Sequence, residues 1–447
     1  MTHFLQWLHD FVWGAPALIL ILSVGLFLTV SLGFVQVTRF PRAAAEFLAQ
    51  LRPQKTREEG VTSFQALCTA LAATVGTGNL VGVAGAICLG GPGAIFWMWI
   101  CGILGMALKY GEAALAVRYR VRTAEGFLGG PMYGIIRGMG EKFRPLALAY
   151  CLFGVLASFG VGNGAQINSV LTGIHGVLSL FGIGRTKLGS LLLGLLLAGF
   201  LGRLLLRGAG GIGAAAERLV PLAAMGYVLL CLGVLVCRAE AIPGAFLAIV
   251  QGAFSPRAVT GGMLGSAFQA LRVGCARGVF TNEAGMGTAA IAHAGAEGKT
   301  PAQQGHMGIM EVFLDTIVIC TLTALVILVS GVPVPYGVDA GAELTTAAFA
   351  SVYGGLAPVI MALFLSLFAI ATVLGWSLYG GRCAQFLWGN GAWKPYVLVQ
   401  SLVVVLSSVL DTAPVWQISE TLNGLMAIPN LILLAAMSPE LRRLTKE

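Results

Sequence analysis

Apolar stretches of about 20 residues recur along most of this chain, and they leave few folds open to it. Each is long enough for a helix that crosses the hydrocarbon core of a bilayer, and eleven candidates begin near residues 14, 62, 94, 146, 187, 219, 258, 306, 356, 395 and 416. Of the 447 residues, 57% are hydrophobic and 10% charged, whereas soluble domains carry about 25% charged residues. The sequence therefore predicts an all-α polytopic membrane protein, embedded in membrane lipid, with eleven transmembrane helices.

Lysine and arginine residues gather in short clusters between these apolar segments. Loops rich in basic residues stay in the cytoplasm, and 23 of the 27 basic residues fall on one side if the first helix runs from outside to inside. This predicts a protein of the plasma (inner) membrane with its N-terminus outside and its C-terminus cytoplasmic. The clusters form no basic stripe with interleaved aromatic residues, so we expect neither nucleic acid nor an obligatory protein partner.

Motifs of enzyme active sites are missing from the sequence. It contains no GxSxG, HExxH or P-loop pattern, and its nine cysteines lie almost all in apolar segments without a CxxC pair. We therefore expect no enzymatic activity and no organic cofactor.

Two apolar segments are unusually rich in glycine and polar residues. The first contains AATVGTGNL at 72–80, and the second contains TGGMLGS at 260–266 followed by Gln269. Glycine weakens a helix, and unwound backbone at membrane depth is tolerated where it lines a cavity. Both segments are candidate broken helices, although close packing through small residues is the alternative.

The two candidate breaks are five segments apart, which indicates an internal repeat. Five is odd, so two repeats of five helices would insert with opposite topology, and broken helices in matching places mark a transporter's central site. We predict one extra helix and a linker at 1–60, a first repeat at 61–240, a second repeat at 241–437 and a tail at 438–447. The apolar stretch 243–254 is too short to span and is expected to form a loop helix at the start of the second unit.

An unwound stretch in the membrane offers carbonyl oxygens to a hard cation such as Na⁺ and free N–H groups to a carboxylate. Thr74, Thr77 and Asn79 add neutral oxygen atoms at the first break, and we expect no Asp or Glu near it to serve as a cation ligand or a proton carrier. Neutral oxygens favour coupling to Na⁺ over coupling to H⁺.

Few other polar residues lie deep in the apolar segments, so each is a candidate for function. They bind substrate or serve as hydrogen-bonding contacts between helices, and they are Asn163, Gln166, Asn168, Ser366, Thr372, Trp376 and Ser377. The acids Glu112, Glu283 and Asp315 lie near predicted cytoplasmic ends, and we expect gates or ion pairs with Arg118, Arg272 or Arg277. His293 and His306 are expected in a polar cytoplasmic loop.

Seven motifs give the chain a strong resemblance to the alanine or glycine:cation symporter family. They are ALCTALAATVGTGNLVGVAGAICLGGPGAIFWMW (66–99), GGPMY (129–133), FGVGNGAQINS (159–169), ARGVFTNEAGMGTAAIAHA (276–294), DTIVICTLTALVILVSG (315–331), TVLGW (372–376) and LNGLMAIPNL (422–431). The family is similar in fold to the leucine-transporter type of sodium symporter, which has a core of five plus five inverted helices. That core and one extra helix match the eleven segments.

The resemblance implies a set of binding residues. The carbonyls of Ala72 and Val75, with an oxygen of Thr372, would hold Na⁺ as the coupling ion. The amides of Thr77 and Gly78 would meet the substrate carboxylate. The pocket wall would be formed by Gln166, Gln269, Thr372 and Trp376, beside the polar groups of Thr74 and Asn79.

Gly164 departs from the family pattern, because a bulkier residue such as Met is expected there. Either it opens the pocket to substrates larger than alanine, or it faces a neighbouring helix and permits close contact. The predicted function is import of a small neutral amino acid (alanine, glycine or similar) by symport with Na⁺, with alternating access around a midplane site. An H⁺-coupled or larger-substrate carrier, for instance for glutamine, and an amino-acid sensor without transport are the alternatives.

Overall fold

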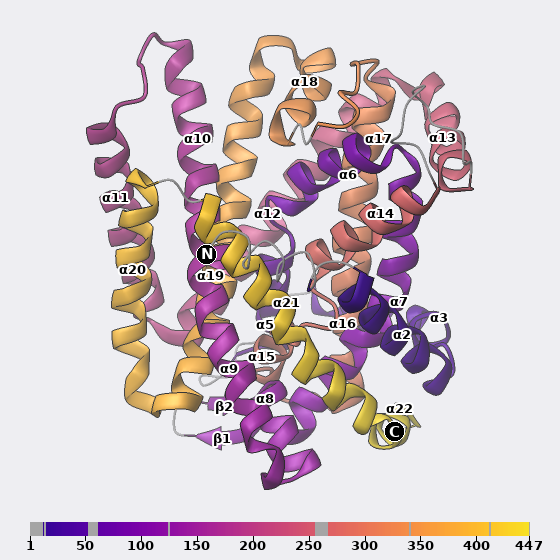
Figure 1. Cartoon of the computed structure of the whole chain (residues 1–447), viewed down its shortest axis with the longest axis vertical. Coiled ribbons are helices and arrows are strands. Elements are labelled where there is room, and N and C mark those ends of the chain that lie inside the picture. The colour runs from indigo at the N-terminus through magenta and orange to yellow at the C-terminus, as the bar shows by residue number, and fades with distance from the viewer. Residues whose placement is uncertain are drawn as a thin grey trace.

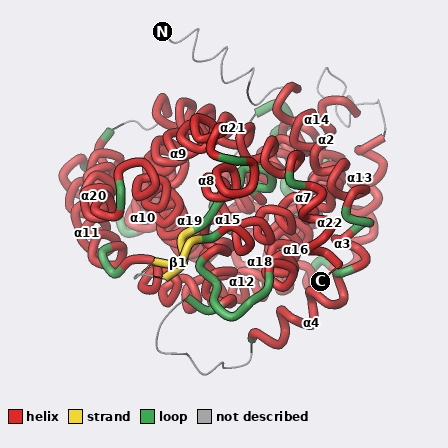
Figure 2. Tube along the Cα trace, turned by 90° about the horizontal axis from the view of Figure 1, so that it is seen from below, coloured by secondary structure: helices red, strands yellow, loops and turns green. Residues whose placement is uncertain are grey.

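The computed structural model of the chain describes residues 12, 15–51, 61–123, 126–254, 267–338, 341–410 and 413–446. These residues form a bundle of helices with one short antiparallel hairpin, in which Val121 pairs with Leu128 (Figures 1 and 2). The first half of the bundle comprises α2 (Ala15–Ser31), α3 (Val35–Thr38), α4 (Phe40–Gln50), α5 (Ser63–Thr74), η1 (Gly78–Gly82), α6 (Val83–Gly90), α7 (Gly93–Tyr119), β1 (Val121–Thr123), β2 (Gly126–Leu128), α8 (Pro131–Gly134), η2 (Ile135–Met139), η3 (Glu141–Phe143), α9 (Arg144–Phe159), η4 (Gly160–Gly164), α10 (Ala165–Leu180), α11 (Lys187–Leu205) and α12 (Gly208–Cys237).

The second half also consists of helices. It comprises η5 (Ala239–Ala241), α13 (Ile242–Phe254), α14 (Ala267–Asn282), α15 (Thr288–Ala294), α16 (Pro301–Val312), η6 (Phe313–Cys320), α17 (Thr321–Val329), α18 (Gly341–Tyr353), η7 (Gly354–Leu356), α19 (Ala357–Trp388), η8 (Asn390–Ala392), α20 (Trp393–Val409), α21 (Ala413–Ala436) and α22 (Ser438–Lys446). The helix expected at 243–254 is present as α13.

Within the described ranges, eight helices are long and apolar enough to cross a membrane, and a ninth results if the bent pair α5 and Gly78–Gly90 is one span. The multi-pass membrane class is therefore confirmed. Two more predicted spans correspond to α2, which has 17 residues, and to the interrupted pair α14 and α15. The number eleven stays a prediction.

Segments that the distribution of basic residues predicts on opposite sides of the membrane lie at opposite ends of the bundle. The hairpin, α8 and α22 lie at one end, and α13 and α18 lie at the other (Figure 1). At one edge of the bundle α11 packs beside α20, and α10 packs along α19 (Figures 1 and 2). Of the interrupted helices, α5 packs against α12 and α19, and α14 packs against α7.

Local sequence explains where several helices begin. Thr62 accepts a hydrogen bond from the N–H of Gln65, whose side chain accepts one from the N–H of Thr62, and this capping box starts α5. Thr300 and Gln303 form the same motif at the start of α16, where Pro301 occupies the first turn. Both caps lie at the ends of helices that lead to the interrupted centre.

Candidate functional site

The first helix break lies between α5 and η1, where the chain bends by 49°. The N–H of Val75 still bonds to the carbonyl of Leu71 (2.7 Å), but the N–H of Gly76 turns to the Oδ1 atom of Asn79 (2.9 Å). The carbonyls of Ala72 to Val75 therefore have no partner in the helical ladder of the described residues. The break predicted at 72–80 is present.

Helix α19 brings Thr372 against this break. A Cβ atom added to Gly76 would lie 2.7 Å from the Oγ1 atom of Thr372, and one added to Gly375 would lie 2.9 Å from the backbone nitrogen of Ala73. Only glycine permits so close an approach at both positions. The hydroxyl of Thr372 therefore lies beside the break, and hydroxyl and carbonyl oxygen atoms suit a hard cation.

A small cavity of about 20 Å³ opens beside the break. A volume of this size holds about one water molecule. It is lined by residues from five parts of the chain: Ala73, Thr74, Gly76, Thr77, Gly78, Val161, Gln166, Phe280, Thr281, Glu283, Thr372, Trp376 and Asn423. Six of the predicted binding residues, Thr74, Thr77, Gly78, Gln166, Thr372 and Trp376, are therefore brought together.

Gln166 is tied directly to the first break. Its Oε1 atom accepts a hydrogen bond from Thr77 Oγ1 (3.2 Å), and its Nε2 atom donates to the carbonyl of Val161 (3.1 Å). This pairing fixes the amide plane of Gln166 at the cavity wall.

Four predicted site residues do not line the cavity: Ala72 and Val75, expected to bind Na⁺ through their carbonyls, and Asn79 and Gln269. Gln269 is half-buried near the start of α14. Asn79 is fully buried, and besides accepting from Gly76 it donates to the carboxylate of Asp315 (2.7 Å). Its contacts give it a role in holding the break, so direct contact between Asn79 and substrate stays a prediction without support from the geometry.

The expectation that no carboxylate lies near the first break is wrong. Asp315 reaches it through Asn79, and Glu283 lines the cavity itself. Both acids come from segments more than 200 residues further along the chain, so the sequence around 72–80 gives no sign of them. The preference for Na⁺ over H⁺ therefore cannot rest on an absence of acids.

A second helix break separates α14 from α15. Glu283, Gly285 and Gly287 have φ angles of 52°, 92° and 75°, a left-handed conformation that glycine adopts without strain. For Glu283 this conformation is uncommon, and such residues cluster at functional sites. The second break predicted at 260–266 lies outside the described residues, whereas this one lies within the quoted motif TNEAGMG (281–287).

Glu112 of α7 binds the freed backbone of the second break. Its Oε1 atom accepts hydrogen bonds from the N–H groups of Gly285 (2.8 Å) and Gly287 (3.2 Å) and from Asn430 Nδ2 (2.8 Å). A buried carboxylate thus replaces the missing helical acceptors. The sequence alone suggested a gate or an arginine ion pair for this residue, and the structure shows neutral partners instead.

Glu283 links the second break to the cavity wall. Its Oε1 atom accepts a hydrogen bond from Trp376 Nε1 (2.9 Å), and its Oε2 atom accepts one from Thr288 Oγ1 (2.7 Å). The expected arginine pairs of Glu283 and Asp315 are likewise wrong, because the hydrogen-bond partners of both carboxyl groups are neutral. Trp376 owes its position to this contact and to Gly162, where an added Cβ would lie 2.3 Å from Trp376 Cβ.

Sequence reasoning missed Phe280, Thr281 and Asn423 at the cavity. The Oδ1 atom of Asn423 is buried and has no hydrogen-bond partner among the described residues, so it is an acceptor available to a ligand. The motifs FTNEAG (280–285) and LNGL (422–425) contain these residues and were the available signal. Their approach to the first break depends on the tertiary fold.

Gly164 points away from the cavity. A Cβ atom at this position would lie 2.9 Å from Ser407 Oγ on α20, which favours the interpretation that Gly164 permits close helix contact. Its neighbour Asn163 donates to the carbonyl of Gln400 on the same helix (2.9 Å). This face of η4 serves helix packing, and Gln166 belongs to the face that meets the cavity.

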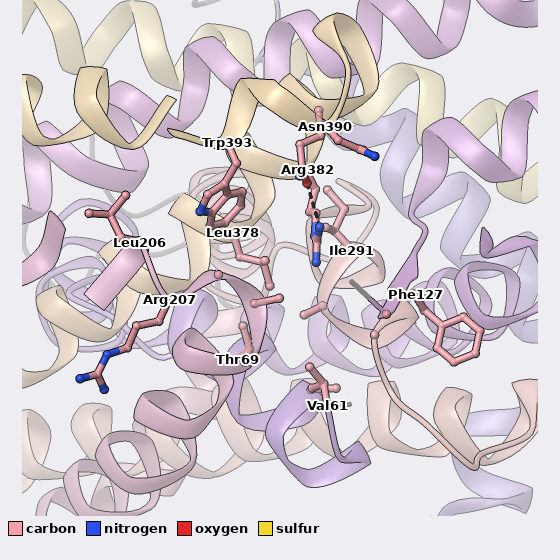
Figure 3. A pocket seen from close by; sticks show the side chains of 18 of the residues that line it. Val61, Thr69, Phe127, Leu206, Arg207, Ile291, Leu378, Arg382, Asn390 and Trp393 are labelled. Atoms are coloured by element: carbon pink, nitrogen blue, oxygen red, sulfur yellow. Dashed lines mark hydrogen bonds between the residues drawn. The ribbon is translucent and has the colours of Figure 1, made fainter. Parts of the chain in front are cut away.

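A larger cavity of about 580 Å³ lies toward the end of the bundle that carries the hairpin. It is lined by α5 (Ala66, Thr69), α15 (Ile291, Ala292) and α19 (Leu378, Arg382, Gln385), among others. Figure 3 shows Arg382 between Trp393 and Ile291, with Phe127 of the hairpin at the rim. The same helices α5 and α19 line the small cavity, and Trp376 of α19 borders the small cavity and is not among the residues that line the large one.

The two histidines are buried, which corrects the expectation of a polar loop. His293 contacts Gln304 through Nδ1 (2.7 Å) and Glu311 through Nε2 (3.1 Å), and Glu311 pairs with Lys109 (2.8 Å). Gln304 in turn accepts from Ser63 at the start of α5 (2.8 Å). His306 contacts Glu46 (2.9 Å). This buried cluster connects α5, α7, α15 and α16 away from the cavity.

Comparison with known proteins identifies the family of the chain. The model of the sodium:alanine symporter family matches residues 1–447. The chain belongs to the sodium:alanine symporter family. The resemblance in the sequence motifs is thereby confirmed, and the protein is a membrane transporter of the amino-acid symporter class.

Several relatives align along nearly the whole chain. The chain is 42% identical to the sodium/alanine symporter AgcS of Methanococcus maripaludis, over 96% of this chain and 93% of the relative. It is 35% identical to the amino-acid carrier protein AlsT of Bacillus subtilis, over 96% and 88%. It is also 35% identical to a Bacillus subtilis protein named "Probable sodium/glutamine symporter GlnT", over 98% and 88%.

Solved transporters share the fold at low sequence identity. MhsT in complex with L-phenylalanine aligns with a TM-score of 0.50 and 14% identity, over 88% of this chain and 99% of that chain. Mhp1, a nucleobase-cation-symport-1 family transporter, aligns with a TM-score of 0.52 and 16% identity, over 87% and 78%. These likenesses confirm a fold of the leucine-transporter type.

Proposed function

We propose that this protein imports a small neutral amino acid, alanine or glycine, by symport with Na⁺ across the plasma (inner) membrane. The observation that carries the proposal is the cavity at the first helix break, where backbone freed from the helix faces Thr77 and Gln166. Family membership supports the coupling ion, and the relative AgcS supports the substrate.

The polar groups around this cavity would match the two charged groups of an amino acid. Free N–H groups of Thr77 and Gly78 at the start of a helix bind a carboxylate. The buried Oδ1 atom of Asn423 is an acceptor for the ammonium group. Phe280 and Val161 would supply an apolar wall for a short side chain. The cavity of about 20 Å³ holds about one water molecule, so the helices around it would have to move apart to admit the amino acid.

The coupling ion fits beside the substrate. The carbonyls of Ala72 and Val75 and the hydroxyl of Thr372 would hold Na⁺ with neutral oxygen atoms. The Thr372 hydroxyl lies against Gly76, so an ion here would draw α19 and the broken helix together. The ion would supply positive charge near the substrate carboxylate, and Thr74 would stabilise the same wall.

Transport would proceed by alternating access between the two faces of the membrane. We propose eleven spans: α2 as the extra helix, a first repeat from α5 to α12 and a second, inverted repeat from α14 to α21, each opening with a broken helix. The N-terminus would lie outside and α22 in the cytoplasm. Trp376, held by Glu283, would separate the substrate from the large cavity on the cytoplasmic side.

A second candidate is coupling to H⁺, which the carboxyl group of Glu283 at the cavity favours. A larger substrate is the alternative to alanine or glycine, because one relative is named as a probable sodium/glutamine symporter. A binding protein without transport is the third outcome of the experiment below.

Uptake into proteoliposomes separates these functions. With 100 mV negative inside, one charge contributes about 2.3 kcal/mol, and a tenfold Na⁺ gradient adds about 1.4 kcal/mol, which together support about 500-fold accumulation of labelled alanine. Uptake should disappear in choline buffer at constant pH. Equal uptake in choline that follows a pH gradient would establish H⁺ coupling, stronger competition by glutamine than by glycine would establish the larger substrate, and binding without uptake would indicate a sensor.

A further inference from the structure

The two helix breaks are joined by side chains that do not line the cavity. From the first break, the N–H of Gly76 donates to Asn79 Oδ1 (2.9 Å), and Asn79 Nδ2 donates to Asp315 Oδ1 (2.7 Å). Asp315 belongs to η6, in the middle of the helix formed by α16, η6 and α17. The first break is therefore anchored to a third helix.

From the second break the connection runs to the same carboxylate. The N–H of Ala284 donates to Asn282 Oδ1 (3.0 Å), and Asn282 Nδ2 donates to Thr316 Oγ1 (3.2 Å). Thr316 Oγ1 then donates to Asp315 Oδ2 (2.8 Å). Five hydrogen bonds thus run without interruption from a backbone N–H of one break to a backbone N–H of the other, and we name them the break-to-break chain.

The direction and burial of these bonds give the break-to-break chain one hydrogen-bonding arrangement. Asn79, Asp315 and Thr316 are fully buried and Asn282 is 1% exposed, so a broken bond would leave a polar group without water to replace its partner. Asp315 accepts at both oxygens, and each asparagine accepts a backbone N–H and donates its amide onward. No member can reorient without breaking at least one of these five bonds.

We propose that the break-to-break chain makes the two helix breaks move as one unit, with Asp315 and Thr316 as positioning residues for transport. Hydrogen-bonded networks with discrete arrangements are able to carry coupling between sites. The substrate carboxylate is proposed to meet the first break, and Glu283 of the second break holds Trp376. The break-to-break chain therefore couples substrate binding at the first break to the contact between Glu283 and Trp376 at the second break.

Thr316→Val is the most selective substitution, because valine keeps the shape of threonine and replaces only the hydroxyl with a methyl group. The methyl group of Thr316 would still pack near Gly102 of α7. Thr323→Val is the matched control on the same helix. Thr323 bonds to Tyr227 (2.8 Å) and to the carbonyl of Ile319 (3.0 Å) and takes no part in the break-to-break chain.

Transport and equilibrium binding are measured on the full chain in proteoliposomes and detergent. These transport and binding measurements rest on the proposed function, so uptake of alanine with Na⁺ by the wild-type protein must be seen first. Thr316→Val should lower the maximal transport rate at least fivefold while the Kd for alanine changes less than threefold, and Thr323→Val should leave both unchanged. Asp315→Asn should lower the transport rate less than Thr316→Val does, because an asparagine accepts from Asn79 and donates to the oxygen of Thr316, while the Thr316 proton loses its acceptor.

Hydrogen exchange tests the coupling itself. In wild type, peptides spanning 74–80 and 282–288 should gain protection with the same midpoint in an alanine titration, and in Thr316→Val the two midpoints should separate. Wild-type midpoints that differ by more than threefold would overturn the proposal even if the variant failed to fold. So would a Thr316→Val protein that transports like wild type, or an Asp315→Asn protein that loses Na⁺ dependence while Thr316→Val keeps it, because Asp315 would then be an ion ligand. Absence of wild-type uptake would instead reject the proposed function.

Discussion

The two helix breaks at the centre of this protein are stabilised in opposite ways. At the first, a neutral side chain within the break, Asn79, binds the freed N–H of Gly76. At the second, a carboxylate from another helix, Glu112, binds the N–H groups of Gly285 and Gly287. A break that supplies its own partners leaves its carbonyls available to ligands, whereas one held by a distant acid depends on the packing of the whole bundle.

The largest effect should come from removing the support of the second break. Glu112→Ala leaves two buried N–H groups without an acceptor, and each costs about 1–3 kcal/mol, so the protein should lose about 2–6 kcal/mol of stability. Glu112→Gln retains one oxygen at the same place and should lose less than half as much. Thermal unfolding in detergent measures both, and equal losses in the two variants would contradict the assigned role of the carboxylate oxygen.

Glu283→Ala tests the link between the second break and the cavity. Loss of the acceptor frees Trp376 Nε1 and Thr288 Oγ1, and two buried donors without partners should weaken alanine binding by about a hundredfold. Glu283→Gln preserves an acceptor for Trp376 and should stay within about tenfold of wild type. Binding of labelled alanine to purified protein distinguishes the pair, and full affinity in Glu283→Ala would remove Glu283 from the site.

Gln166→Ala tests the first break from the side of the cavity. Thr77 loses its partner, and the substrate loses a polar neighbour, so affinity should fall about tenfold to a hundredfold while the melting temperature stays near that of wild type. Asn79→Ala should lower affinity and stability together, because Asn79 holds the break and does not line the cavity. A Gln166→Ala protein with wild-type affinity would return Gln166 to a packing role.

The smallest effect on specificity is expected at Gly164. Gly164→Met meets Ser407 on α20, and overpacking there should cost about 1–3 kcal/mol of stability without altering the order in which alanine, serine, threonine and glutamine compete. Gly162→Ala, which pushes on Trp376, should alter that order. A narrowed substrate range in Gly164→Met would restore the hypothesis that this residue borders the substrate.

The sequence predicts the first break well because its cause is local. Glycines, threonines and Asn79 lie within nine residues at 72–80, and unwinding follows from their conformational preferences. The membrane class and the helix starts likewise follow from apolar runs and caps such as Thr62. These features are set by neighbours in the sequence.

The second break and the acids are hidden from such reasoning because their causes are tertiary. Glu112 and Gly285 are 173 residues apart, and Asp315 meets Asn79 across 236 residues. Proximity to arginines in the sequence suggested ion pairs for these acids. The fold instead pairs them with backbone N–H groups, amides and hydroxyls, which no local pattern specifies.

Equilibrium binding of alanine to the purified protein, measured in Na⁺ and in choline at one pH, tests the central claim most directly. If one site at the first break holds substrate and Na⁺ together, linkage requires each ligand to raise the affinity of the other by the same factor. We predict at least a tenfold lower Kd for alanine in saturating Na⁺, and the same factor for Na⁺ when alanine is saturating. The same Kd in Na⁺ and in choline would contradict the account.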